Sequence, residues 1–198
     1  MASAITATLT TILMGTLSDK IGKRKLFICV GYILWGLSIF SVIFLREDIL
    51  SKNASMMVSA ATLGVSLTII LDCVMTFFGS TANDAAFNAW LTDSTDPTNL
   101  GAAEGINAMM PLVSILVVFG GFMFFDLEKA SSWSAIFAII GTVVTVVGIL
   151  GFFIINAPPV EQMADPSWES ILYGFRPKTV KGNPALYLAL LAFIIFNI

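Results

Sequence analysis

Asp72 is the residue with the clearest potential for chemistry in this chain. It follows the uncharged run 54–71, which is long enough to enter a membrane as a helix. A carboxylate at membrane depth costs about 2.5–3.5 kcal/mol on insertion scales, so it usually faces a cavity or a partner. Helical spacing puts several small or polar residues on or near its face, with Asp84 farther round: Thr76, Gly79, Ser80 and Asn83. This polar stripe predicts the lining of a water-filled path for a solute or a cation. The alternative is a carboxylate that hydrogen-bonds a neighbouring helix and handles no substrate.

Three more polar residues have both a functional and a structural interpretation. Asp84 and Asn88 are expected toward the end of the same helix, where water has access. Asn107, on the next apolar segment, either lines the same cavity or only bridges two helices.

A second concentration of reactive groups is the stretch GTLSDKIGKRK, which begins at Gly15. Five charges fall within seven residues here, and long uncharged runs lie on both sides. We expect Gly15 to allow tight helix packing and Gly22 to allow a turn with positive φ. Lys23 and Arg24 are expected to orient the chain in the membrane more than to do chemistry. Glu104 is expected in the first turn of a later helix, where it complements the helix dipole or pairs with Lys23 or Arg24.

The composition argues against a soluble protein and against an enzyme. The 198 residues are 57% hydrophobic and 12% charged, and the mean hydropathy is +0.91, so the lipid bilayer is the natural solvent and partner of the chain. There is no histidine, and the only cysteines, Cys29 and Cys73, lie inside apolar runs. We therefore expect no metal site, disulfide, cofactor or nucleophile–base pair. The net charge of −3 carries no signature of nucleic-acid binding.

Apolar runs of about 20 residues, enough to cross the hydrocarbon layer, must position these groups. Such runs cover 26–45, a stretch from near residue 54 to beyond residue 71, 105–125 and 132–155. The run 2–17 is slightly short, and the run 185–198 stops at the end of the sequence. We predict an all-α integral membrane protein with six hydrophobic segments, the first and last of them cut off.

The basic residues assign the loops to the two sides of the membrane. With alternating crossings, seven of them share one face with the acidic turn 92–99, namely Lys20, Lys23, Arg24, Lys25, Arg176, Lys178 and Lys181. Arg46, Lys52 and Lys129 lie on the opposite face. The positive-inside rule puts the first group in the cytoplasm and the start of the chain outside. Since no signal peptide is evident, we expect missing sequence upstream, and the apolar ending indicates missing sequence downstream.

The charged stretch resembles the signature of the major facilitator superfamily, which is Gly, three residues, Asp, Arg or Lys, one residue, Gly and two basic residues. The fixed positions are matched by Gly15, Asp19, Lys20, Gly22, Lys23 and Arg24. The resemblance implies about half of a twelve-helix carrier. The bundle 1–156 would hold a truncated helix 2 through helix 6, 157–184 the central cytoplasmic loop, and 185–198 the start of helix 7. Helix 1 and the C-terminal bundle would be missing partners from the same polypeptide.

The same resemblance implies secondary active transport of a small solute by alternating access, in a multi-pass protein of the plasma membrane. It implies that Asp19 is a conformational latch; the alternative is a loop carboxylate neutralised by Lys20 and Lys23. The region 82–105 is loosely similar to glycoside–pentoside–hexuronide cation symporters, which implies cation symport of a sugar or glycoside. We favour H⁺ over Na⁺ as the coupling ion, because the run 2–17 has no acidic residue. The rival interpretation is a non-transporting membrane sensor or scaffold that keeps the fold.

Overall fold

The computed structural model describes residues 2–45, 60–156, 177–185, 187–189 and 192. Every element among these residues is a helix, and the chain divides into two compact units, Met1–Glu161 and Gln162–Ile198. The described part of the first unit contains α1 (Ala2–Ile21), α2 (Arg24–Ser41), η1 (Val42–Leu45), α4 (Ala60–Gly79), η2 (Ser80–Phe87), α5 (Asn88–Ser94), α6 (Leu100–Phe122) and α7 (Ala130–Ile154). The second unit contains the short α8 (Pro177–Gly182), within the segment predicted as a loop. Most of that segment and of the predicted helix 7 lies outside the described residues.

The first unit contains four helical spans, among the residues described, that are long and apolar enough to cross a membrane. They are Arg24–Leu45, Thr62–Ser94, Leu100–Phe122 and Ala130–Ile154. They confirm the predicted fold class, an all-α membrane bundle, and each coincides with a predicted apolar run. The short predicted run at the start of the sequence forms the 20-residue helix α1.

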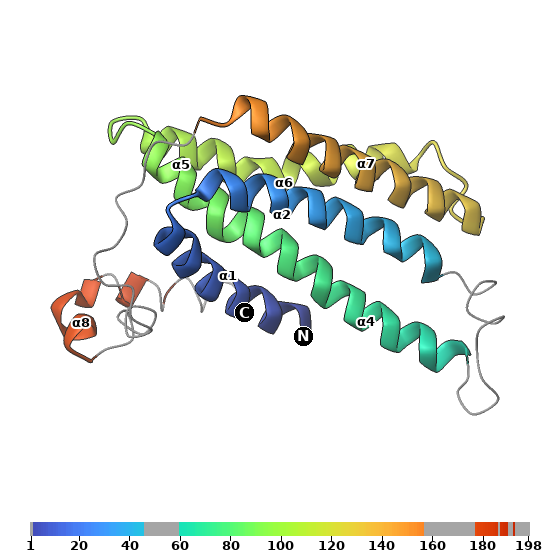
Figure 1. The fold of residues 1–198 in the computed structure, drawn as a ribbon, viewed down its shortest axis with the longest axis horizontal. Helices are drawn as coiled ribbons and strands as arrows, with labels where there is room; N and C mark the ends of the chain where they lie inside the picture. Colours follow the sequence, from blue (N-terminus) through green and yellow to red (C-terminus); the bar gives the residue numbers. More distant parts are fainter. Residues whose placement is uncertain (1, 46–59, 157–176, 186, 190–191, 193–198) are drawn as a thin grey trace. The chain divides into compact units, whose positions relative to one another are not determined.

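Helix α2 lies between α4 and α7 and contacts both of them (Figure 1). Its contact with α7 depends on the absence of side chains, because a Cβ added to Gly148 would come within 2.8 Å of the Ile33 nitrogen. Gly141 opposes the Gly36 carbonyl in the same interface. The small-residue strip of α7 therefore serves helix packing, as small residues do in membrane proteins.

Three elements, α4, η2 and α5, follow one another without a break and form one long helical span. Its middle part, η2, is a π-helix of eight residues. A π-helix bonds residue i to i+5 and turns the chain less per residue than an α-helix does, and such segments often occur at functional sites. Ala82, Ala85 and Ala86 of η2 are buried, so the π-helical stretch is also a point of close packing with its neighbours.

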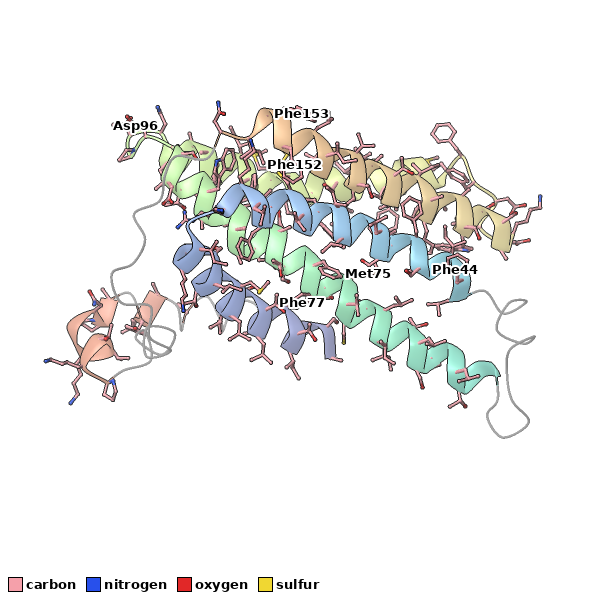
Figure 2. The ribbon with its side chains drawn as sticks, in the orientation of Figure 1. Phe44, Met75, Phe77, Asp96, Phe152 and Phe153 are labelled. Carbon is pink, nitrogen blue, oxygen red and sulfur yellow. The ribbon has the colours of Figure 1, made fainter. Side chains whose placement is uncertain are left out.

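Large apolar side chains cover the outer surface of the first unit. Phe44 at the end of η1 and Phe153 at the end of α7 are 66% and 81% exposed (Figure 2). No residue of α6 is buried, although that helix is largely apolar. An exposed apolar surface of this extent is unfavourable in water and suits the hydrocarbon of a bilayer.

Candidate functional site

The charged stretch forms a compact ion cluster at one end of the first unit. Arg24, at the start of α2, donates from Nη2 to Asp19 Oδ1 of α1 at 2.7 Å. Its Nη1 donates to the Ala89 carbonyl of α5 at 2.7 Å and forms an ion pair with Asp93 of the same helix. The Arg24 side chain is only 10% exposed, whereas both carboxylates keep about a third of their surface in solvent. One guanidinium therefore joins three helices.

This cluster bears on two expectations for the charged stretch. The role of Arg24 in orienting the chain stays a prediction, and its fork of donors makes it the centre of the cluster. Asp19 pairs with Arg24 and not with the lysines considered for it. Lys20 and Lys23 are exposed and take no part in this contact.

The two glycines of the stretch shape its turn and its packing. Gly22 has φ 67°, the only positive φ among the described residues, which confirms the predicted turn. Its N–H donates to the Ser18 carbonyl at 2.9 Å and so ends α1. A Cβ added to Gly15 would lie 4.0 Å from the Ala85 Cβ of η2, which is ordinary van der Waals contact and does not demand a glycine.

A second site is a cavity of about 320 Å³ beside the long span. It is lined by Trp35 of α2 and by Asp72, Met75, Thr76, Gly79, Ser80, Asn83 and Asp84 of the span. All the predicted pathway residues of this span therefore lie around one cavity. Their part in transport stays a prediction. Met75 marks the position of the cavity along α4 (Figure 2).

Asp84 reaches this cavity although ideal helical spacing puts it farther round. At 3.6 residues per turn, Asp84 would point about 120° away from Asp72. The π-helical winding from Ser80 onward turns the chain less per residue and brings Asp84 toward the same face.

The comparison with protein families decides the identity of the fold that carries these two sites. The model of the Major Facilitator Superfamily matches residues 1–198. The chain belongs to the major facilitator superfamily. No curated protein and no solved structure matches it. As a superfamily member with four candidate spans in its described part, it is a multi-pass integral membrane protein and a membrane transporter.

Two residues of this superfamily member were not singled out from the sequence: Trp35 lines the cavity, and Tyr32 bonds one of its lining residues. Tyr32 of α2 donates its hydroxyl to Asn83 Oδ1 at 3.1 Å, and Asn83 Nδ2 donates to Asp84 Oδ1 at 3.2 Å. The Trp35 indole packs so closely on Gly79 that an added Cβ would lie 3.1 Å from its Cε2 atom. The spacing of Tyr32 and Trp35, three residues apart on one helix face, was the available signal, but aromatic residues in apolar runs usually face lipid or core.

The remaining candidates of the superfamily member lie apart from the cavity. Asn107 of α6 donates to Asn88 Oδ1 of α5 at 3.1 Å, which is the helix-bridging alternative. Glu104 is the fifth residue of α6, one turn later than predicted, and it is exposed. Neither of the basic residues proposed for Glu104 forms an ion pair with it among the described residues, because Arg24 is occupied by the two aspartates. The described residues contain no group of three histidine, cysteine or acidic side chains that would hold a metal ion.

Proposed function

We propose that this chain forms part of a secondary active transporter that moves a small solute by alternating access. The observation that carries the proposal is the polar cavity wall from Asp72 to Asp84, which follows the uncharged run 60–71 of the same helical span. An ionisable residue within a membrane span is expensive, and it commonly marks a substrate or ion pathway. In this proposal the cavity wall is one side of that pathway, and the rest of the carrier, including a further helix and a second bundle, supplies the opposite side.

We further propose that transport is coupled to a cation and proceeds as symport across the plasma membrane. Two carboxylates in the cavity wall can each accept a positive charge during the cycle. The loose similarity to glycoside–pentoside–hexuronide cation symporters favours a sugar or glycoside as the solute. The absence of acidic residues from 2–17 favours H⁺ over Na⁺.

The ion cluster has a second role in this proposal, as the conformational latch. Arg24 joins the ends of α1, α2 and α5, so these helix ends move together only while its contacts hold. A charge-assisted contact is worth about 1.5–3 kcal/mol, enough to bias one state of a two-state cycle by roughly tenfold or more.

Uptake by the full-length carrier in proteoliposomes tests the proposal. Imposed pH and sodium gradients, with a panel of labelled solutes, should reveal accumulation that one of the gradients drives. Asp72→Asn should reduce that accumulation at least about tenfold, since it removes the charge from the cavity wall. The matched control is Asp126→Asn, because Asp126 lies in the loop before α7 and pairs with Lys129. Equal uptake by Asp72→Asn and wild type would reject the pathway, and no gradient-driven uptake of any solute would favour a sensor or scaffold.

A further inference from the structure

Three polar side chains of the cavity wall lack partners in the part of the chain that the structure describes. They are Asp72, Thr76 and Ser80, which follow one another at four-residue spacing along α4 and the first residue of η2. Ser80 is only 5% exposed and still lines the cavity. The Ser80 hydroxyl is therefore reached from the cavity alone, and a ligand there could bond it together with Asp72 and Thr76.

Other hydroxyl groups of the same span behave differently. Thr68, Thr81 and Thr92 each donate to the carbonyl four residues earlier, at 2.7–3.0 Å. This is the usual way in which a helix satisfies a threonine inside a membrane. Thr76 makes no such bond and faces the cavity. The hydroxyl groups of Thr76 and Ser80 are therefore free to bond a molecule in the cavity.

The charge of the wall indicates what kind of ligand it takes. Asp72 and Asp84 line the cavity, and residues 60–94 contain no lysine, arginine or histidine. Arg24 cannot compensate these charges, since its guanidinium is held by Asp19 and Asp93. A positive charge must therefore reach the wall from a ligand or from elsewhere in the carrier.

The size and the aromatic lining indicate an organic cation. A cavity of about 320 Å³ holds far more than a single metal ion. The Trp35 indole lies on the wall, held against Gly79, and aromatic faces attract cations. An ammonium group has three donors and no acceptor, which matches a carboxylate and two hydroxyl oxygens.

We propose that Asp72, Thr76 and Ser80, together with Trp35, bind the ammonium group of an organic cation, and that this cation is the transported solute. An amino sugar satisfies both this inference and the sugar class favoured above. Asp84, hydrogen-bonded to Asn83, stays separate from the ammonium site and serves the coupling cation. The claim that this cation is the transported solute rests on the proposed function, whereas the claim that the cation binds here does not.

Equilibrium binding to the protein in lipid nanodiscs, measured by calorimetry at pH 6, tests the inference. The cationic probes are glucosamine and n-butylammonium, and the neutral probes are glucose and N-acetylglucosamine. We expect the cations to bind at least about tenfold more tightly than the neutral probes, because the charge-assisted contacts require the ammonium group. Equal binding of glucosamine and N-acetylglucosamine would overturn the inference.

Matched variants locate the binding. Asp72→Asn should weaken glucosamine binding at least about tenfold and Ser80→Ala about threefold, while Asp126→Asn leaves it unchanged. Trp35→Phe should weaken it about threefold, and Trp133→Phe should not, because Trp133 packs against Phe122 and Phe137 away from the cavity. Undiminished glucosamine binding by Asp72→Asn would reject the ammonium site. The site would also be rejected if the wild type bound sodium but no amine, and Asp72→Asn lost the sodium binding. Binding without uptake would reject only the transport proposal, and uptake of a neutral sugar without amine binding would reject only this inference.

Discussion

The ion cluster around Arg24 and the cavity wall around Asp72 differ in whether their charged groups have partners. In the cluster, one buried guanidinium contacts two carboxylates and a backbone carbonyl. In the wall, a carboxylate and two hydroxyl groups point at a cavity and have no partner among the described residues. The difference teaches that polar side chains of the helical spans serve two purposes. The Nη1 and Nη2 contacts of Arg24 hold helices together, whereas the cavity-facing groups of the wall indicate a site for a ligand that arrives from outside.

Removal of Arg24 should produce the largest loss of stability. Arg24→Gln leaves two carboxylates close together without a cation; breaking a buried pair costs about 3–5 kcal/mol, and partial exposure of the carboxylates reduces this to about 2–4 kcal/mol here. Thermal unfolding in detergent measures the loss. The stability of Arg24→Lys should lie between those of the wild type and Arg24→Gln, since an ammonium group keeps the charge but cannot form the same fork of hydrogen bonds. The control Lys129→Gln affects only an exposed pair and should change little. A stable Arg24→Gln protein would contradict the structural role of the cluster.

Removal of the Asp72 charge should change stability in the opposite direction. Asp72→Asn eliminates an unpaired carboxylate within the span, so the free energy of unfolding should stay the same or rise by about 1–2 kcal/mol, less than the full insertion cost because the residue is exposed to the cavity. The same unfolding assay compares this variant with Arg24→Gln. A destabilised Asp72→Asn protein would indicate that Asp72 has a structural partner and would weaken the contrast between the two sites.

Asp19→Asn tests whether the cluster also acts as a latch. The variant keeps the Arg24–Asp93 pair but loses one charge-assisted contact, which should shift the ratio of inward-open to outward-open states by roughly tenfold. We expect normal membrane insertion, reduced uptake and altered labelling of an engineered cavity cysteine from the cytoplasmic side. Lys23→Gln should have a smaller effect on uptake, since Lys23 is exposed. Wild-type uptake and labelling in Asp19→Asn would reduce the stretch to a topological anchor.

Asp96, in the loop between α5 and α6, should give the smallest effect. The Thr98 hydroxyl and then the Thr98 N–H donate to its carboxylate and lower its pKa below the usual value of 3.8. Because the folded pKa is lowered, this turn is fully stabilised above pH 3.8 and loses that contribution as the pH falls through the folded pKa. NMR titration of the Asp96 carboxyl carbon measures the shift. Thr98→Val should move the pKa of Asp96 back toward 3.8. Thr92→Val should not, because the Thr92 hydroxyl donates to the Asn88 carbonyl.

The sequence predicted those parts of the molecule that depend on local pattern. Run lengths predicted the spans, and the position of Gly22 in the charged stretch predicted its positive φ. The periodicity of the apolar run likewise predicted that Asp72, Thr76 and Ser80 share a face. Each of these follows from chain geometry over a few turns of helix.

The features that the sequence did not predict depend on contacts between distant segments. Arg24 and Asp93 are 69 positions apart, and only their expected location on one side of the membrane connected them in the sequence. Trp35 and Tyr32 resembled the many other aromatic residues of apolar runs. Packing of α2 on the long span places Trp35 in the cavity lining and lets Tyr32 bond Asn83. No residue pattern distinguished the π-helical stretch from an ordinary helix, so the winding that brings Asp84 toward the face of Asp72 was not predicted.

The π-helical stretch η2 lies between Asp72 of the cavity wall and Asp93 of the ion cluster on one continuous helical span. An α-helix rotates the chain by about 100° per residue, and π winding rotates it by less. The angle about the helix axis between Asp72 and Asp93 is therefore set by how many residues adopt π winding. A change of one residue in that number would leave Asp72 where it is and turn Asp93 away from Arg24, so the two sites are kept in phase by the winding of the backbone between them.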